Sequence, residues 1–204
     1  MKKTVALLVL AAATVSLAFI PKNAEDRFVV VLDAGHGGKD HGVSHNSDTE
    51  KFITEQVSKK IRQLNSDAEI AIHLTRDADE FKDLGSRTAM INSLDADLVL
   101  SLHVQGHKNP QASGMELYVG KDNPQKTKSL EYAEKLSAKL QKNHAINMRP
   151  AKEAPFYVLK NSNAPAVMLE LGFLTNERDR NYLTSEKEQD KIARTISEFI
   201  RESK

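Results

Sequence analysis

Three short apolar segments limit the fold of this chain more than any other feature. They are rich in Val and Leu, helical patterns separate them, and they cover residues 28–33, 97–103 and 166–170. Segments of this length and composition are typical of strands that are buried on both faces of a sheet. Strands that alternate with helices predict an α/β fold: a three-layer sandwich whose mostly parallel or mixed central sheet has helices on both faces.

The remaining sequence continues this alternation. Apolar residues at Ile53, Val57, Ile61 and Leu64 lie on one helical face, and Asp48 or Thr49 is the expected N-cap of that helix. In total we predict about six strands, at residues 28–33, 69–74, 97–103, 114–119, 156–159 and 166–170. Helices are expected at about 49–64, 84–94, 125–144 and 185–201. No repeat or second domain is expected, so residues 25–204 form one domain.

Composition excludes several classes of function. Charged residues make up 28% of the chain, and the formal net charge is only +1. Basic residues are scattered among acidic ones, which argues against a nucleic-acid partner. The absence of cysteine excludes disulfides, a thiolate zinc site and a cysteine nucleophile.

The N-terminus predicts export. Two lysines precede an apolar stretch from Val5 to Ile20, which as a helix of 16 residues would span about 24 Å. This is shorter than the roughly 30 Å hydrocarbon core, so residues 1–24 are expected to be a signal peptide with a short polar joint, cleaved after Ala18. An uncleaved membrane anchor is the alternative, with no other membrane contact. Both place the rest of the protein outside the cytoplasmic membrane, in a periplasmic or extracellular location.

Each of the three strands leads to a residue that can bind a metal or move a proton. His36 follows the first strand in a glycine-rich turn, His103 ends the second, and Glu170 ends the third. Ligands gather beyond the carboxyl ends of the strands in such sheets. Two imidazoles and a carboxylate therefore predict one shared site, with a metal as the expected occupant.

Each of these residues also has an ordinary explanation. Taken alone, His36 could be a solvated loop residue, His103 a hydrogen-bonded core histidine, and Glu170 one half of a buried ion pair. A second carboxylate, Glu50, lies at the start of the first helix, where it could simply complement the helix dipole. The residues alone leave open which of Glu50 and Glu170 binds the metal and which carries protons.

Four separated segments resemble a known family. They are residues 32–40 around His36, residues 50–51, residues 101–103 and residues 170–176, with a spacer formed by Leu84, Arg87, Ala89 and Asn92. These segments are similar to the zinc-dependent N-acetylmuramoyl-L-alanine amidases of the third amidase type, which are bacterial cell-wall hydrolases. The resemblance extends from about Phe28 to Arg201, which is nearly the whole domain.

The resemblance implies a role for each candidate residue. His36, Glu50 and His103 would bind one Zn²⁺ per chain, and Glu170 would be the catalytic carboxylate. The bond cleaved would be the amide between N-acetylmuramic acid and the L-alanine of the peptidoglycan stem peptide. A non-catalytic peptidoglycan-binding or regulatory protein that keeps this fold is the alternative, and another zinc amide hydrolase acting on exported peptides is a third. We expect peptidoglycan as partner, and either unregulated activity or control by a protein that supplies localisation or activation.

Some positions depart from the family pattern. His41 stands where proline is usual, and Gln105 replaces an Asn or Asp. Arg149 falls where the family often has an arginine that could contact a substrate carboxylate, although a solvated loop arginine is the alternative. Gln105 and Arg149 are therefore candidate substrate-binding residues. His41 and His45 lie near His36 but not at a strand end, so we do not expect them to bind the metal.

Overall fold

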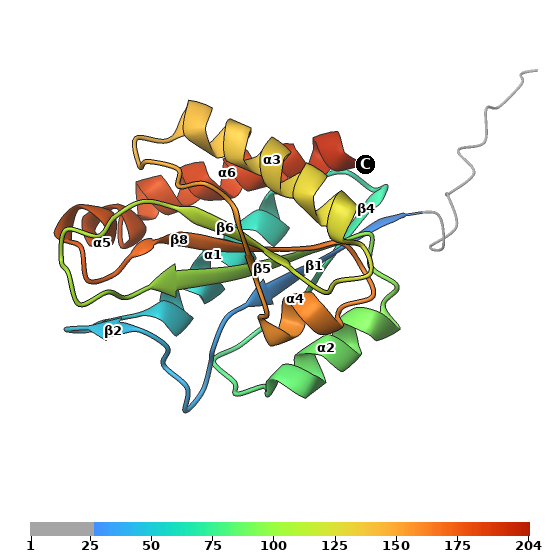
Figure 1. The fold of residues 1–204 in the computed structure, drawn as a ribbon, viewed down its shortest axis with the longest axis horizontal. Helices are drawn as coiled ribbons and strands as arrows, with labels where there is room; N and C mark the ends of the chain where they lie inside the picture. The colour runs from blue at the N-terminus through green and yellow to red at the C-terminus, as the bar shows by residue number, and fades with distance from the viewer. Residues whose placement is uncertain (1–26) are drawn as a thin grey trace, which may run out of the picture.

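The computed structural model describes residues 27–204 of the protein (Figure 1). The predicted signal peptide or anchor at residues 1–24 lies outside the described residues. None of the helices within residues 27–204 is long and apolar enough to cross a membrane.

A six-stranded sheet forms the centre of the molecule. Its strands lie in the order β4 (Ile70–Leu74), β1 (Phe28–Ala34), β5 (Leu98–Gln105), β8 (Ala166–Phe173), β6 (Glu116–Gly120) and β7 (Lys152–Ala154). The pair β6–β8 is antiparallel, and every other pair is parallel. This confirms the predicted mixed sheet. The carboxyl ends of β1, β5 and β8 meet at one edge, where the amino end of β6 joins them.

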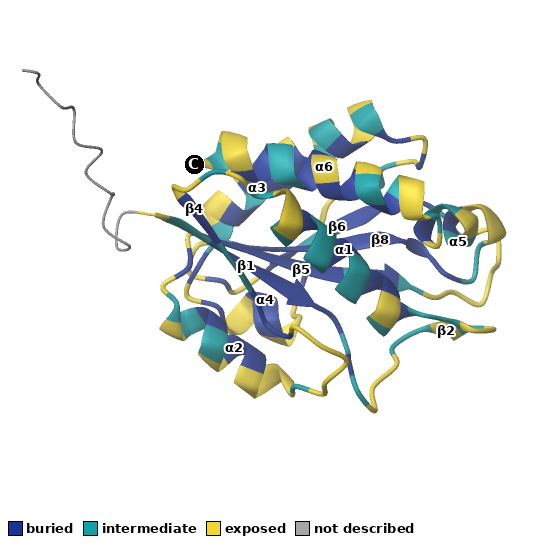
Figure 2. Ribbon diagram, turned by 180° about the vertical axis from the view of Figure 1, so that it is seen from behind, coloured by how far each residue is buried: buried dark blue, intermediate teal, exposed yellow. Residues whose placement is uncertain are grey.

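Helices cover both faces of the sheet. On one face lie α1 (Glu50–Leu64), α3 (Lys126–Asn143), α5 (Glu177–Leu183) and α6 (Glu186–Ser203), and on the other lie α2 (Leu84–Ser93) and α4 (Tyr157–Asn161). Figure 2 shows the sheet as the buried middle layer, with exposed residues on the outer surfaces of the helices. A small hairpin of β2 (Ser44–His45) and β3 (Asp48–Thr49) precedes α1.

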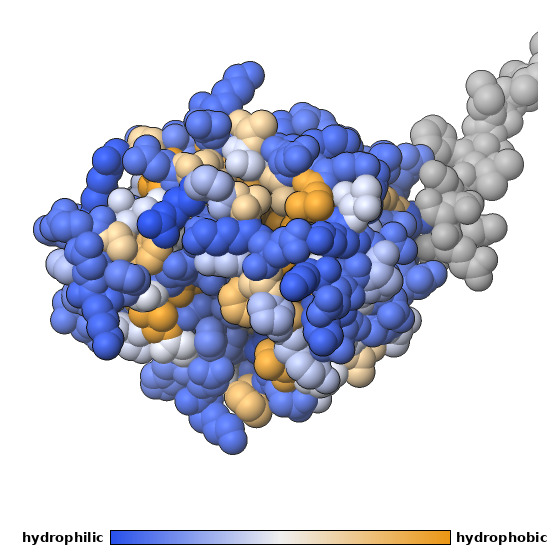
Figure 3. Space-filling model, in the orientation of Figure 1, coloured by the Kyte–Doolittle hydropathy of each residue, from blue (hydrophilic) through white to orange (hydrophobic). Residues whose placement is uncertain are grey.

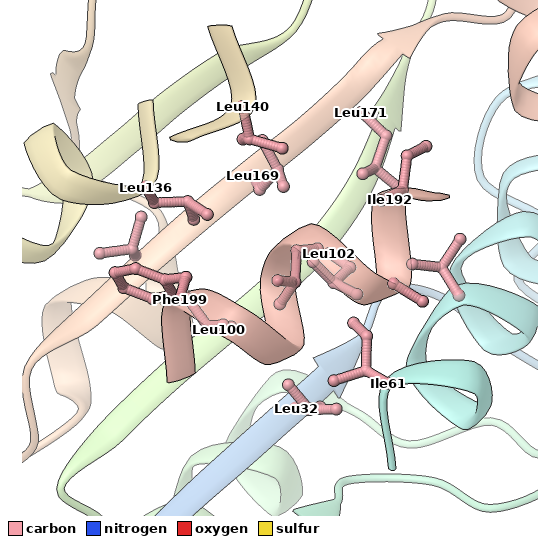
Figure 4. Packing of buried hydrophobic residues seen from close by; sticks show 14 of the residues in the cluster. Leu32, Ile61, Leu100, Leu102, Leu136, Leu140, Leu169, Leu171, Ile192 and Phe199 are labelled. Atoms are coloured by element: carbon pink, nitrogen blue, oxygen red, sulfur yellow. The ribbon is translucent and has the colours of Figure 1, made fainter. Parts of the chain in front are cut away.

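The alternation of side chains along each strand divides the core into two layers. Val30 and Leu32 of β1 pack into the layer below α1, α3 and α6, whereas Val31 packs into the layer below α2 and α4. Figure 4 shows the first layer, where Phe199 and Ile192 of α6 meet leucines of the sheet. Burial of each such side chain contributes roughly 1.5–3 kcal/mol to the free energy of folding. This packing holds the strands in place, and with them the strand ends that carry the site residues.

The strand predicted at residues 156–159 is wrong. The chain instead forms the short helix α4, in which Lys160 N donates to Phe156 O over 2.9 Å. Four apolar residues are too few to distinguish a buried strand from a helical turn. Asn123 Nδ2 donates to Leu159 O over 2.7 Å and so satisfies a carbonyl at the end of this helix. The sheet position is taken by β7, which lies a few residues earlier.

Three other elements were not predicted, and one cap differs. The hairpin β2–β3 and the helix α5 are too short to show a hydrophobic period. Thr49 precedes α1 as predicted, but its side chain makes no capping hydrogen bond. Glu50 N instead donates to Val43 O over 2.8 Å. Leu64, placed on the buried face of α1 by its spacing, is 41% exposed.

Candidate metal and active site

His36 lies in the turn directly after β1, in a left-handed backbone conformation with φ of 61°. Its Nδ1 is 2.9 Å from Asp40 Oδ2, which orients the ring, and its Nε2 is 3.1 Å from Glu50 Oε1. A Cβ at Gly35 would lie 2.5 Å from the ring of His103, so only glycine allows the turn to pass this close. The turn therefore presents one imidazole nitrogen towards the end of β5.

Glu50 is the first residue of α1, and its side chain turns back into the sheet edge. It is only 2% exposed. Its Oε1 accepts from Val104 N and lies beside His103 Nδ1, both at 2.9 Å, while its Oε2 accepts from Val43 N at 2.8 Å. A Cβ at Gly42, where φ is 63°, would lie 2.4 Å from Glu50 Oε2. The carboxylate is thus held in a cradle that a larger residue would fill.

These three side chains converge on one point. One ligand atom from each of His36, Glu50 and His103 lies within 4.8 Å of the others. Two imidazole nitrogens and a carboxylate oxygen are ligands that zinc accepts, and three protein ligands leave a position open for water or substrate. The donor set and its glycine-lined surroundings therefore fit a divalent metal.

The electrostatics of the cluster also suit a cation. Burial raises the pKa of Glu50, but hydrogen bonds with His103 and His36 lower it to about 2. Burial lowers the pKa of His36, but the hydrogen bond and charge of Glu50 raise it to about 9. The pKa of His103 rises for the same reason. Glu50 therefore stays ionised. Its negative charge can interact with a bound metal ion, either together with the imidazoles or in place of their protons.

Glu170 lies beside this cluster in β8. Its Cα pairs with that of His103 across β5–β8 and with that of Glu116 across β6–β8. Its Oε2 is buried and has no hydrogen-bond partner. Burial raises the pKa of Glu170 to about 7, against the opposing charge of His103 and with the help of the Glu50 and Glu116 carboxylates. A carboxyl group that titrates near neutral pH can both accept and return a proton.

Two buried arginines that the sequence did not single out as site residues hold the His36 turn from below. Arg87 donates to Ala34 O over 2.7 Å and to His36 O, and its Nη1 is 2.8 Å from the buried Asp33. Arg76 donates to Ala34 O over 3.1 Å and to Gly35 O over 3.2 Å. Three successive carbonyls of the turn are therefore fixed by guanidinium groups. Arg87 belongs to the spacer that resembles the family, which was the one signal of its importance.

A cleft of about 880 Å³ opens over the site. Gln105, a candidate substrate contact, lines this cleft and donates to Glu116 Oε2 over 3.0 Å. Arg149 is not among the residues that line the cleft. Its Nη1 is 3.9 Å from Glu116 Oε2, and its guanidinium lies over the ring of Phe173 at 5.2 Å.

The other histidines do not belong to the group of metal-ligating side chains found within residues 27–204. The group of metal-ligating side chains found within residues 27–204 contains neither His41 nor His45. His144 is buried and its Nε2 is 2.9 Å from Thr195 Oγ1, so it is structural. His107 Nδ1 accepts a hydrogen bond from Asn109 N over 3.0 Å.

Comparisons with known proteins agree on one family. Residues 30–202 match the sequence profile described as N-acetylmuramoyl-L-alanine amidase. The N-acetylmuramoyl-L-alanine amidase LytC of Bacillus subtilis is 33% identical over 168 residues, which cover 82% of this chain and 34% of LytC. This chain spans between 34% and 65% of the length of three curated relatives that it matches, LytC among them.

Solved structures share the fold as well. The N-acetylmuramoyl-L-alanine amidase from Clostridium difficile 630 has a TM-score of 0.82 at 29% identity, with 87% of this chain and 96% of that chain covered. The CwlD amidase from Clostridioides difficile, solved in complex with the GerS lipoprotein, has a TM-score of 0.79 at 30% identity. The match covers 87% of this chain and 98% of the CwlD chain. Since the profile match includes nearly every described residue, this chain belongs to the N-acetylmuramoyl-L-alanine amidase family of the third amidase type.

Proposed function

We propose that this protein is a zinc-dependent hydrolase of the amide bond between N-acetylmuramic acid and the L-alanine of the peptidoglycan stem peptide. The observation that carries the proposal is the convergence of His36, Glu50 and His103 within 4.8 Å, with Glu170 next to His103 in strand register. Membership of the amidase family supports the choice of bond.

His36, Glu50 and His103 would hold the zinc ion. When bound, zinc supplies a Lewis acid that polarises the scissile carbonyl and lowers the pKa of water towards about 7. Asp40 keeps the His36 ring oriented through Nδ1, so that Nε2 faces the site. The buried arginines below the turn keep the His36 backbone in place.

Glu170 would move the proton. Its free Oε2 accepts a proton from the attacking water as the water oxygen bonds to the carbonyl carbon. The same carboxyl group then gives the proton to the alanine nitrogen as the C–N bond breaks, so that a lactyl carboxylic acid and a free amine are released. A pKa near 7 suits both transfers at neutral pH.

Export and a protein partner complete the proposal. The apolar N-terminal stretch at residues 5–20 supports an exported protein that meets peptidoglycan outside the cytoplasmic membrane. The complex of the relative CwlD with the GerS lipoprotein supports a partner that localises or activates the enzyme. Gln105 lines the cleft and would contact the substrate there, whereas Arg149 does not line it and would contact only a substrate that extends past Glu116.

Digestion of purified sacculi tests this function. We expect the protein to release intact stem peptides with a free L-alanine amine, to lose this activity with a chelator, and to regain it with zinc. Tight sacculus binding without release would favour the non-catalytic alternative. Cleavage of free peptides without sacculus turnover would favour another amide hydrolase.

A further inference from the structure

Large exposed apolar side chains are concentrated at the cleft. Among residues 27–204, six such side chains are more than about a third exposed: Phe52, Leu64, Phe81, Leu84, Phe156 and Tyr157. The last four all line the cleft that contains the metal ligands and Glu170. We call these four residues the apolar wall. Figure 3 shows apolar residues in the lower half of the face, where Figure 1 places α2 and α4, as well as in its upper half.

The apolar wall is built on fixed elements. Phe156 and Tyr157 begin α4, whose next two residues, Val158 and Leu159, are buried under the sheet. The Phe156 ring packs edge to face on Tyr118, with ring centroids 5.2 Å apart. Phe81 precedes α2, which lies on the same face of the sheet as α4, and the Lys39 ammonium lies 4.6 Å from the Phe81 ring centroid. These aromatic rings therefore face the cleft without needing to be ordered by a ligand.

The bond that the enzyme is proposed to cleave dictates what must lie nearby. Its carbonyl belongs to a lactyl group that is joined by an ether oxygen directly to a sugar ring, so that ring has to sit within a few bonds of the reacting atoms. Pyranose rings with equatorial substituents present axial C–H groups on their faces, and such faces pack on the electron-rich faces of aromatic rings.

We propose that the apolar wall binds the glycan strand of the substrate, with sugar rings packed on Phe156 and Tyr157. This inference rests on the proposed function.

A comparison of two substrates tests the wall. One is a muramoyl peptide of at least one disaccharide, and the other is the same peptide carrying only the lactoyl group. We expect Phe156→Ala and Tyr157→Ala each to lower kcat/KM about tenfold on the muramoyl peptide and less than about twofold on the lactoyl peptide. Phe52→Ala is the matched control, because Phe52 is 59% exposed but does not line the cleft. It should leave both values unchanged.

Equal losses on both substrates, or no loss on either, would overturn the glycan assignment. The second result would also point to a protein partner as the occupant. If the wild-type protein cleaves neither substrate, the proposed function fails. Binding of peptide-free glycan strands then tests separately whether the apolar wall binds glycan. Retention of these strands by the wild type and its loss in the double variant Phe156→Ala, Tyr157→Ala would support the assignment. Equal retention, or none in the wild type, would reject it.

Discussion

Glu50 and Glu170 are both buried carboxylates at the same sheet edge, yet their surroundings give them different chemistry. Glu50 contacts both imidazoles and two backbone amides, so it is ionised and fully engaged. Glu170 keeps one buried oxygen without a partner, and burial raises its pKa to about 7. Two carboxylates whose pKa values are driven apart are suited to separate roles, one as ligand and the other as proton carrier.

This difference predicts opposite behaviour of two isosteric variants. Glu170→Gln should bind as much zinc per chain as the wild type but turn over about 10²–10⁴-fold more slowly, because the proposed proton carrier is gone. Glu50→Gln should lose both zinc and activity. Metal content by elemental analysis, measured beside sacculus digestion, checks both variants. Near-normal turnover in Glu170→Gln would remove this residue from the mechanism.

Arg87 contacts the backbone of the turn that carries the proposed metal ligand His36. Its guanidinium bonds to the carbonyls of Ala34 and His36 while it neutralises the buried Asp33, and lysine lacks the planar fork needed for all three contacts. We expect Arg87→Lys to keep a charge beside Asp33 but to weaken zinc affinity by about tenfold or more, as is usual when support for a ligand is lost. Competition with a chromophoric chelator measures this. Unchanged affinity would mean that the His36 turn is rigid without Arg87.

At the scale of elements, the sequence predicted those whose burial pattern is long enough to be distinctive. The strands ending near His36, His103 and Glu170 were predicted because both of their faces are apolar, and α6 because Ile192, Ile196 and Phe199 repeat at helical spacing. The strand proposed at 156–159 failed since a short apolar run does not specify its period. The β7 strand that takes the sheet position is only three residues long, and two of them are exposed.

The same limit applies to the candidate site. Parallel strands fix where their carboxyl ends lie, so the sequence alone could predict that His36, His103 and Glu170 share one edge. The position of Glu50 depends on the loop and hairpin between β1 and α1, whose conformation has no periodic signal. For this reason the residues alone left the metal-binding carboxylate undecided. Sequence patterns do not reveal the support from Arg76, whose buried guanidinium donates to carbonyls that are distant in sequence. They do not reveal the contact of Asp40 either, because this exposed residue lies in the same irregular turn as His36.

At the scale of the whole molecule, His144 joins three helices on one face of the sheet. It follows the last residue of α3, its Nδ1 contacts the Tyr182 hydroxyl in α5, and its Nε2 lies 2.9 Å from Thr195 Oγ1 in α6. Burial, together with the charge of Lys191, lowers the pKa of His144 to about 4. The folded protein therefore contains this imidazole in its neutral form at neutral pH.

Global stability should consequently fall in mild acid. An unfolded chain protonates this histidine near pH 6.5, whereas the folded chain does so near pH 4. Between these values the unfolded state binds more protons, so the free energy of unfolding decreases as the pH falls, by about 2–3 kcal/mol from this group. Urea unfolding of the wild type and His144→Gln at a series of pH values isolates the effect, because other groups such as Glu170 titrate in both proteins. The wild type should lose stability relative to the variant between pH 6.5 and 4, and a constant difference across that range would show that His144 titrates alike in the folded and unfolded chains.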